Sequence, residues 1–261
     1  MPSSRPSKPA RRPAAQQQRP YAVRKRPLTF AVLAGVLILV LVFGAMAALF
    51  SSGNSTAGNQ RSPIPEEGTV QPLPEGHPAL ALARRDAEDP LAMGDADAPV
   101  VMIEYSDFQS AFSGTHARGV HHELIEEYVD AGALRIEFRN FPVYGPESDA
   151  ASRAAWAAGQ QGLFWEFYDA AFADEFHRDT GRFSEEGLRE LAEAAGVPDV
   201  ERMLTDMESP EADEAVATDA EEGVELGATT TPAFLVNGHP IVGAQSMDTF
   251  RDTIDQLLDA A

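Results

Sequence analysis

Cysteine is absent from the 261 residues of this chain. Without it the protein forms no disulfide bond, has no thiolate for thiol–disulfide exchange, and lacks the residue to which bacterial lipoproteins attach their lipid. The stability of an exported domain must then come from its core alone. A hydrophobic content of 44% is ample for such a core, and the length allows one or two domains.

Basic residues are scarce outside the N-terminal segment. Residues 1–27 contain eight Lys or Arg and no acid, whereas residues 28–261 contain the other 12 against all 41 Asp and Glu. A body this acidic repels nucleic acid and anionic membrane surfaces, and it favours solubility. The composition therefore predicts no nucleic-acid partner.

One long apolar run is present, and it carries no charge from residue 28 to residue 50. A helix of this length spans roughly 34 Å, enough for the hydrocarbon core of a bilayer. Because the basic flank precedes it, the positive-inside rule predicts a cytoplasmic tail over residues 1–27 and an extracytoplasmic remainder. We therefore expect a single-pass protein of the cell membrane. A cleaved signal peptide ending near Ala45-Met46-Ala47 is the alternative, although the run is longer than the usual signal core.

The next segment, residues 51–94, is predicted to be a linker because it is rich in Ser, Gly and Pro. A short helical piece is expected within it, around Ala79–Arg85. The pattern becomes that of a folded domain at about residue 95, and we assign residues 95–261 to that domain.

Strand patterns flank the first predicted helix of the domain. The apolar, β-branched run over residues 98–106 predicts a buried strand. A helix is expected from Ser110 to Gly132. The second strand, over residues 133–143, alternates apolar side chains with Arg135, Glu137 and Arg139, so the apolar set is predicted to point inward and the charged set outward.

Helical patterns fill the chain from about residue 145 to about residue 227. An aromatic segment in this region, residues 163–172, and the pair Met203 and Met207 are interpreted as core. Two further strands follow around an Asn237-Gly238 turn, and a last helix begins at Ser246. The order strand–helix–strand, helices, hairpin, helix predicts an α/β thioredoxin fold. The stretch over about 145–227 is then a helical insertion between its βαβ and ββα halves.

Several segments, taken together and in order, resemble the DsbA-like thiol–disulfide oxidoreductases, in particular their membrane-anchored bacterial branch. The resemblance covers residues from about 80 to 261. The segments that carry it are DPLAMGDADAPVVMIEYSDFQ, FRNFPV, QQGLFWEFYDAAF, GATTTPAFLVNG and VGAQSMDTF.

This resemblance implies roles for individual positions. Ser110 takes the position of the attacking redox cysteine, and Ser113 that of the resolving one. A Thr-cis-Pro loop, here Thr231-Pro232, is implied opposite them, and Glu104 matches the buried acid beneath the redox pair. The groove beside this site is expected to bind substrate through the residues Phe108, Ala111, Phe112, Thr231 and Pro232.

Two serines cannot carry out the family's reaction. Disulfide exchange needs a thiolate, whose formation a helix N-terminus favours, and an alcohol is far less acidic. The sequence therefore predicts a redox-inactive relative that binds peptides or acts as a chaperone, with exported or membrane proteins as clients. No cofactor and no metal are predicted. A Cys-to-Ser form of a disulfide oxidoreductase, whether natural or engineered, remains an alternative.

Three other chemistries are weighed. Kappa-type glutathione transferases carry a similar serine segment at the same helix start, so Ser110 would hydrogen-bond a thiolate. A serine nucleophile could combine Ser113, His116 and Asp107, although His116 is more simply a solvated residue. A metal could bind the cluster at His121, His122, Glu123, Glu126 and Glu127, but these side chains are better interpreted as an exposed helix face.

Overall fold

The computed structural model describes residues 70–175 and 178–260. The predicted tail over residues 1–27, the predicted anchor over residues 28–50 and the first part of the predicted linker lie outside these residues. Among the residues that are described, no helix combines the length and the apolar character that crossing a bilayer requires.

A mixed five-stranded sheet forms the centre of the domain. Its strands lie in the order β1-β3-β2-β4-β5. Strands β2 and β3 are parallel, whereas β1 pairs with β3, β4 with β2, and β5 with β4 in antiparallel fashion. The strand bounds are β1 Ala92–Met93, β2 Val100–Ser106, β3 Leu134–Asn140, β4 Ala233–Val236 and β5 His239–Val242. This sheet confirms the predicted thioredoxin-like α/β fold.

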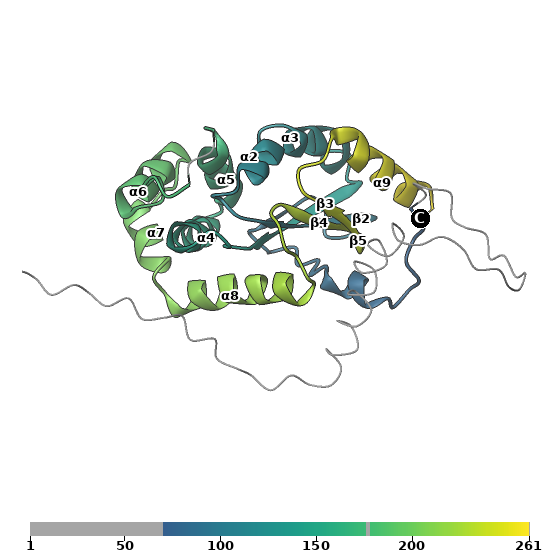
Figure 1. Ribbon diagram of the computed structural model, residues 1–261, viewed down its shortest axis with the longest axis horizontal. Helices are drawn as coiled ribbons and strands as arrows, with labels where there is room; N and C mark the ends of the chain where they lie inside the picture. The colour runs from purple at the N-terminus through teal and green to yellow at the C-terminus, as the bar shows by residue number, and fades with distance from the viewer. Residues whose placement is uncertain (1–69, 176–177, 261) are drawn as a thin grey trace, which may run out of the picture.

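Helices cover both faces of the sheet (Figure 1). Helices α2, α3 and α9 lie on one face, α8 lies on the other, and α4 to α7 gather at one end of the sheet. Helices α4 to α8 lie between β3 and β4 in the chain; that they are an insertion stays a prediction. The helix bounds are α2 Ala111–Ala117, α3 Val120–Leu124, α4 Pro146–Gly159, α5 Phe164–Phe172, α6 Glu185–Ala194, α7 Val200–Asp206, α8 Pro210–Glu225 and α9 Met247–Asp259.

The predicted helix from Ser110 to Gly132 is interrupted. Helix α2 ends at Ala117, Gly119 takes φ −131° and ψ −93°, and α3 starts at Val120. A π-helical turn, η2, follows over Ile125–Val129. The Gly119 backbone lies outside the helical region, so the two helices are free to point in different directions. This interruption decides which side chains of the segment face the sheet.

The charged side of β3 was expected to point outward, and it does not reach solvent. Every residue of β3 is buried, including Arg135, Glu137 and Arg139. The second face of the sheet is covered by α8 and by the segment that precedes β1. Burial of a charge is tolerated only when it is paired, and this requirement is met here.

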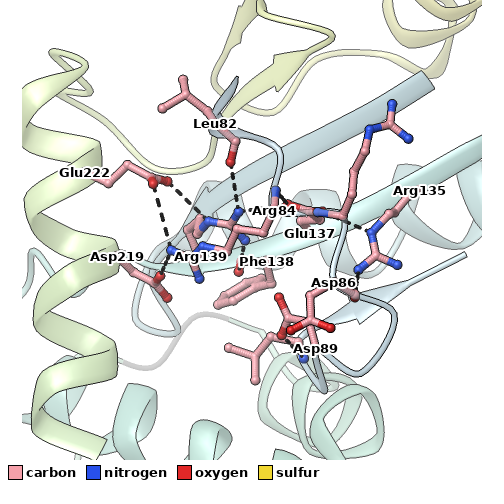
Figure 2. Close-up of polar contacts among 12 residues, drawn as sticks. Leu82, Arg84, Asp86, Asp89, Arg135, Glu137, Phe138, Arg139, Asp219 and Glu222 are labelled. Carbon is pink, nitrogen blue, oxygen red and sulfur yellow. Dashed lines mark hydrogen bonds and ion pairs between the residues drawn. The ribbon is translucent and has the colours of Figure 1, made fainter. Parts of the chain in front are cut away.

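An ion-pair network fills that second face (Figure 2). Glu137 lies between Arg135 and Arg139, with nitrogen–oxygen distances of 3.0 and 2.8 Å. Its carboxylate also accepts hydrogen bonds from the backbone amides of Arg84 and Arg85, at 3.0 and 2.7 Å. Burial alone would raise the pKa of Glu137, but these four donors outweigh it and lower the pKa to about 2.

The predicted linker over residues 51–94 therefore differs from the structure at its C-terminal end. A short 3₁₀ helix, η1, spans Pro78–Leu82 in place of the helical piece expected around Ala79–Arg85. Strand β1 adds to the edge of the sheet, and the Val70 amide donates to Gln256 Oε1 at 2.7 Å. Residues before 95 thus belong to the folded unit, because the buried charges of β3 need them as partners.

Other predictions of packing are confirmed. The aromatic side chains of α5 and the pair Met203 and Met207 belong to one buried cluster. Asn237 and Gly238 have φ of 44° and 82°, the left-handed values that a tight hairpin turn requires.

Candidate functional site

Ser110 stands at the start of helix α2. Its side chain is the N-cap and accepts a hydrogen bond from the Ser113 amide at 3.3 Å. Its hydroxyl also donates to the backbone carbonyl of Thr231 at 2.9 Å. One serine therefore both caps the helix and ties it to a loop 121 residues further along the chain.

That loop contains a cis peptide bond between Thr231 and Pro232. The structure thus brings the Ser110 and Thr231-Pro232 segments together, as the resemblance implies. The link to Ser110 joins the loop before β4 to the loop after β2, because β2 and β4 are neighbours in the sheet. Both Thr231 and Pro232 are buried, so their side chains are not presented at the surface.

The residues around Ser110 differ in how far they reach the surface. Ser113 is buried, and its Oγ has no hydrogen-bond partner among the described residues. Ala111 is exposed, and Phe112 is 64% exposed. Phe108, which was expected to line the groove, is buried and stacks on Phe172 with ring centroids 5.1 Å apart. The exposed surface beside the site is therefore formed by Ala111 and Phe112, while Phe108 is part of the core and also lines a small pocket beside Ser110.

Ser110 lines a small pocket together with Phe108 and Ala111. Gly114, Arg118, Phe172 and Arg182 are among the residues that line it. Arg118 donates to the backbone carbonyls of Phe172 and Asp174 at 2.9 and 2.8 Å. This guanidinium ties α2 to the end of α5 and leaves the pocket small.

Glu104, which the resemblance matches to a buried acid, is fully buried. Burial raises the pKa of its carboxyl to about 7. The hydroxyl of Tyr168 donates to its Oε1 at 3.4 Å, and its Oε2 lies 3.8 Å from Nε2 of His116. Glu104 is on the face of β2 that α2 and α3 cover, opposite the face of the ion-pair network.

The prediction that His116 is solvated is wrong. His116 is fully buried, and burial lowers the pKa of its imidazole to about 3. His121 was expected on an exposed helix face and is also buried. The other members of that cluster are exposed as predicted, and Arg251 pairs with Glu123 and Glu127. Spacing along one continuous helix could not reveal the two buried histidines, because the helix breaks between them.

The structure does not form the serine triad. Asp107 accepts four hydrogen bonds, from the amides of Gln109, Val143 and Tyr144 and from the Ser148 hydroxyl. Both ring nitrogens of His116 lack a hydrogen-bond partner in the described part of the chain, so His116 contacts neither Ser113 Oγ nor Asp107 in this way. Asp107 fixes the loop before α2 and is not part of a charge relay.

Comparison with known proteins places this chain in a family. The family model described as Thioredoxin matches residues 86–256, more than half of the chain. A probable disulfide bond formation protein D of Bacillus cereus is 31% identical over 171 residues, which cover 64% of this chain and 78% of that protein. A Na(+)/H(+) antiporter of Herminiimonas arsenicoxydans is 34% identical over 156 residues, which cover 60% of this chain but only 24% of the antiporter.

A solved structure shows the same fold. The crystal structure of oxidised BdbD from Bacillus subtilis matches with a TM-score of 0.61 and 20% identity, covering 65% of this chain and 92% of that one. The fold, the cis-proline loop and the capped helix start all agree with the resemblance found in the sequence. The chain therefore belongs to the thioredoxin family, among its DsbA-like thiol–disulfide oxidoreductases, and has serine at both positions where that group carries its redox cysteines.

Proposed function

We propose that this protein does not exchange disulfides and instead binds extended segments of exported or membrane proteins beside the Ser110 helix start. The observation that carries the proposal is a contact between the Ser110 helix start and the cis-proline loop in a chain that contains no cysteine. Ser110 contacts the cis-proline loop at 2.9 Å, yet the sequence has no cysteine.

The chemistry of serine supports the redox-inactive part of this proposal. A serine hydroxyl is far less acidic than a thiol, and two serines form no reversible bond equivalent to a disulfide. Ser110 also commits its hydroxyl proton to the Thr231 carbonyl. Because this hydroxyl already donates to the carbonyl, the structure does not support a transferase in which the same hydroxyl donates to a bound thiolate.

An exposed aromatic side chain supports the binding part. Phe112 is 64% exposed at the first turn of α2, next to the exposed Ala111. Covering an exposed aromatic ring with a peptide removes apolar surface from water and so stabilises the complex. The resemblance to the DsbA-like oxidoreductases implies that a client binds beside this loop through backbone hydrogen bonds, which depend little on the client's side chains.

The remaining parts of the proposal concern location. We propose that residues 28–50 anchor the chain in the cell membrane, with residues 1–27 in the cytoplasm and the thioredoxin-fold domain outside. The relative named as a Na(+)/H(+) antiporter supports a membrane association. Antiport itself is not part of the proposal, since this chain covers only 24% of that protein.

Binding of unfolded clients by the full-length protein tests the proposal. We expect the wild type to bind a fluorescent, reduced and alkylated client, and Phe112→Ser to weaken this binding by about tenfold, since a large exposed ring contributes on the order of 1.4 kcal/mol when covered. Val224→Ser is the matched control, because Val224 is 67% exposed but lies on α8. Equal affinity of the wild type and Phe112→Ser for the client would contradict the proposal that this surface binds clients.

Restoring the sulfurs tests the redox part. The variant with Ser110→Cys and Ser113→Cys is expected to reduce insulin in the presence of a thiol donor, whereas the wild type gives the uncatalysed rate. Turnover by the unaltered chain would overturn the proposal. Turnover by the double variant alone would show that only the cysteines separate this protein from its active relatives.

A further inference from the structure

Three metal-ligating residues meet on the covered face of the sheet, outside the peptide-binding surface. Glu104 comes from β2, His116 from α2 and His121 from α3. One ligand atom from each lies within 4.8 Å of the other two. All three residues are at most 1% exposed. This grouping differs from the exposed cluster weighed from the sequence and shares only His121 with it.

The polar atoms of this group are not satisfied by the protein. Glu104 Oε2, both ring nitrogens of His116 and Nδ1 of His121 have no hydrogen-bond partner in the part of the chain that the structure describes. A buried polar atom without a partner costs about 1–3 kcal/mol, and four of them lie in one place. The Glu104–His116 distance of 3.8 Å is too long for a direct hydrogen bond, so the pair does not satisfy itself.

The interruption at Gly119 is what creates the group. On one continuous α-helix, residues five apart are rotated by about 140° around the axis, so His116 and His121 would point to different sides. The break between α2 and α3 turns both imidazoles toward Glu104, and their ring centroids lie 6.1 Å apart.

The residues around this group orient Glu104 toward the histidines and enclose both imidazoles. Tyr168 holds Glu104 Oε1 and leaves Oε2 facing the histidines. Aromatic rings enclose the imidazoles. The ring centroids of Phe234 and His116 lie 4.6 Å apart, and those of Trp165 and His121 lie 5.3 Å apart.

We propose that Glu104, His116 and His121 form a buried site for one zinc ion. Two imidazole nitrogens and one carboxylate oxygen are a ligand set that zinc takes with a fourth, non-protein ligand. Tetrahedral zinc places its ligand atoms about 3.3 Å apart, so atoms that lie within 4.8 Å of one another have to move closer by up to about 1.5 Å. The ion joins β2, α2 and α3 and so supports the helix start that carries Ser110.

Loading with Co²⁺, a spectroscopic substitute for Zn²⁺, tests the site. Because the group is buried, the full-length protein is produced in metal-depleted medium supplemented with Co²⁺, so that the ion is available during folding. We expect one bound ion per chain and the visible ligand-field absorption of a four-coordinate site. This absorption is expected to be absent when Zn²⁺ replaces Co²⁺ in the medium. We also expect Zn²⁺ to raise the melting temperature.

Two variants distinguish Co²⁺ binding at this buried site from Co²⁺ binding at exposed acidic side chains. Glu104→Gln keeps the shape and the bond from Tyr168, and it is expected to weaken Co²⁺ binding by about 10–100-fold or more. The control is His122→Ala, whose imidazole is half-exposed and lies outside the group; it is expected to bind like the wild type. A wild-type protein without bound Co²⁺, or with Co²⁺ that Glu104→Gln retains, would overturn the proposal. The first result does not depend on any variant folding.

Discussion

At the scale of single residues, Ser110 has a structural role at the position where the family carries its attacking cysteine. It caps α2 and binds the Thr231 carbonyl. Removal of an N-cap costs typically about 1 kcal/mol, and loss of a buried hydrogen bond leaves the carbonyl unpaired at similar cost. We expect Ser110→Ala to lower the free energy of unfolding by about 2 kcal/mol, measured by urea denaturation.

Ser184→Ala is the matched control for this prediction. Ser184 caps α6 and accepts only from the Gly187 amide at 3.3 Å, so its replacement removes a cap without a link between distant segments. An equal loss in the two variants would mean that the Ser110–Thr231 contact contributes nothing to stability.

At the scale of elements, the packing of α8 on the sheet depends on a helical glycine. A Cβ added at Gly223 would lie 2.9 Å from two ring atoms of Phe141 and 3.2 Å from Tyr105. Both rings are nearly fully buried and have little room to move. Alanine gains about 1 kcal/mol of helix propensity, but overpacking costs about 1–3 kcal/mol. We expect Gly223→Ala to destabilise the domain by about 1 kcal/mol, measured by thermal unfolding.

Thr218→Ala provides the comparison on the same helix. Thr218 is exposed, so this change gains helix propensity without meeting a neighbour and is expected to be neutral or slightly stabilising. A stabilising effect of Gly223→Ala would show that α8 can shift away from the sheet at no cost.

At the scale of the whole molecule, the Glu137 network connects three distant parts of the chain. Glu137 binds β3 arginines and the amides of residues 84 and 85, while Arg84 and Arg139 reach Asp219 and Glu222 on α8. Removing one partner of a buried ion pair leaves the other charge uncompensated. Glu137→Gln is therefore expected to destabilise the protein by about 3–5 kcal/mol near pH 7.

The pH dependence of this effect follows from the lowered pKa. Glu137 has a pKa of about 2 in the folded state against 4.5 as the ordinary value. A lowered carboxyl pKa stabilises the folded state above the ordinary value, and this stability is lost as the pH falls through the folded pKa. The difference in unfolding free energy between wild type and Glu137→Gln should therefore be constant above about pH 5 and shrink toward pH 2. A difference that does not change with pH would contradict the assignment.

Local patterns in the sequence determined the fold class. The alternation of apolar residues, the helix caps and the Asn237-Gly238 turn depend on nearest neighbours, so the four longer strands, most helices and their order were predictable. Strand β1 and the break at Gly119 were not. The absence of cysteine likewise determined that the chain supplies no thiol of its own to any reaction. The order of the motifs was enough to predict that Ser110 lies opposite Thr231-Pro232. A family resemblance implies contacts between distant segments, whereas periodicity describes only neighbouring residues.

Only the tertiary structure decided what covers each face and which buried groups meet. The charged positions of β3 looked solvent-facing because alternation shows that a strand has two faces but not that α8 and residues before 95 cover the second. His116 and His121 looked like surface residues because a continuous helix was assumed where Gly119 interrupts it. Whether a side chain is buried, and which other side chains it meets, depends on segments that are far apart in the chain. A local sequence pattern does not show which distant segment will pack against it, and this is the physical reason that these features could not be predicted.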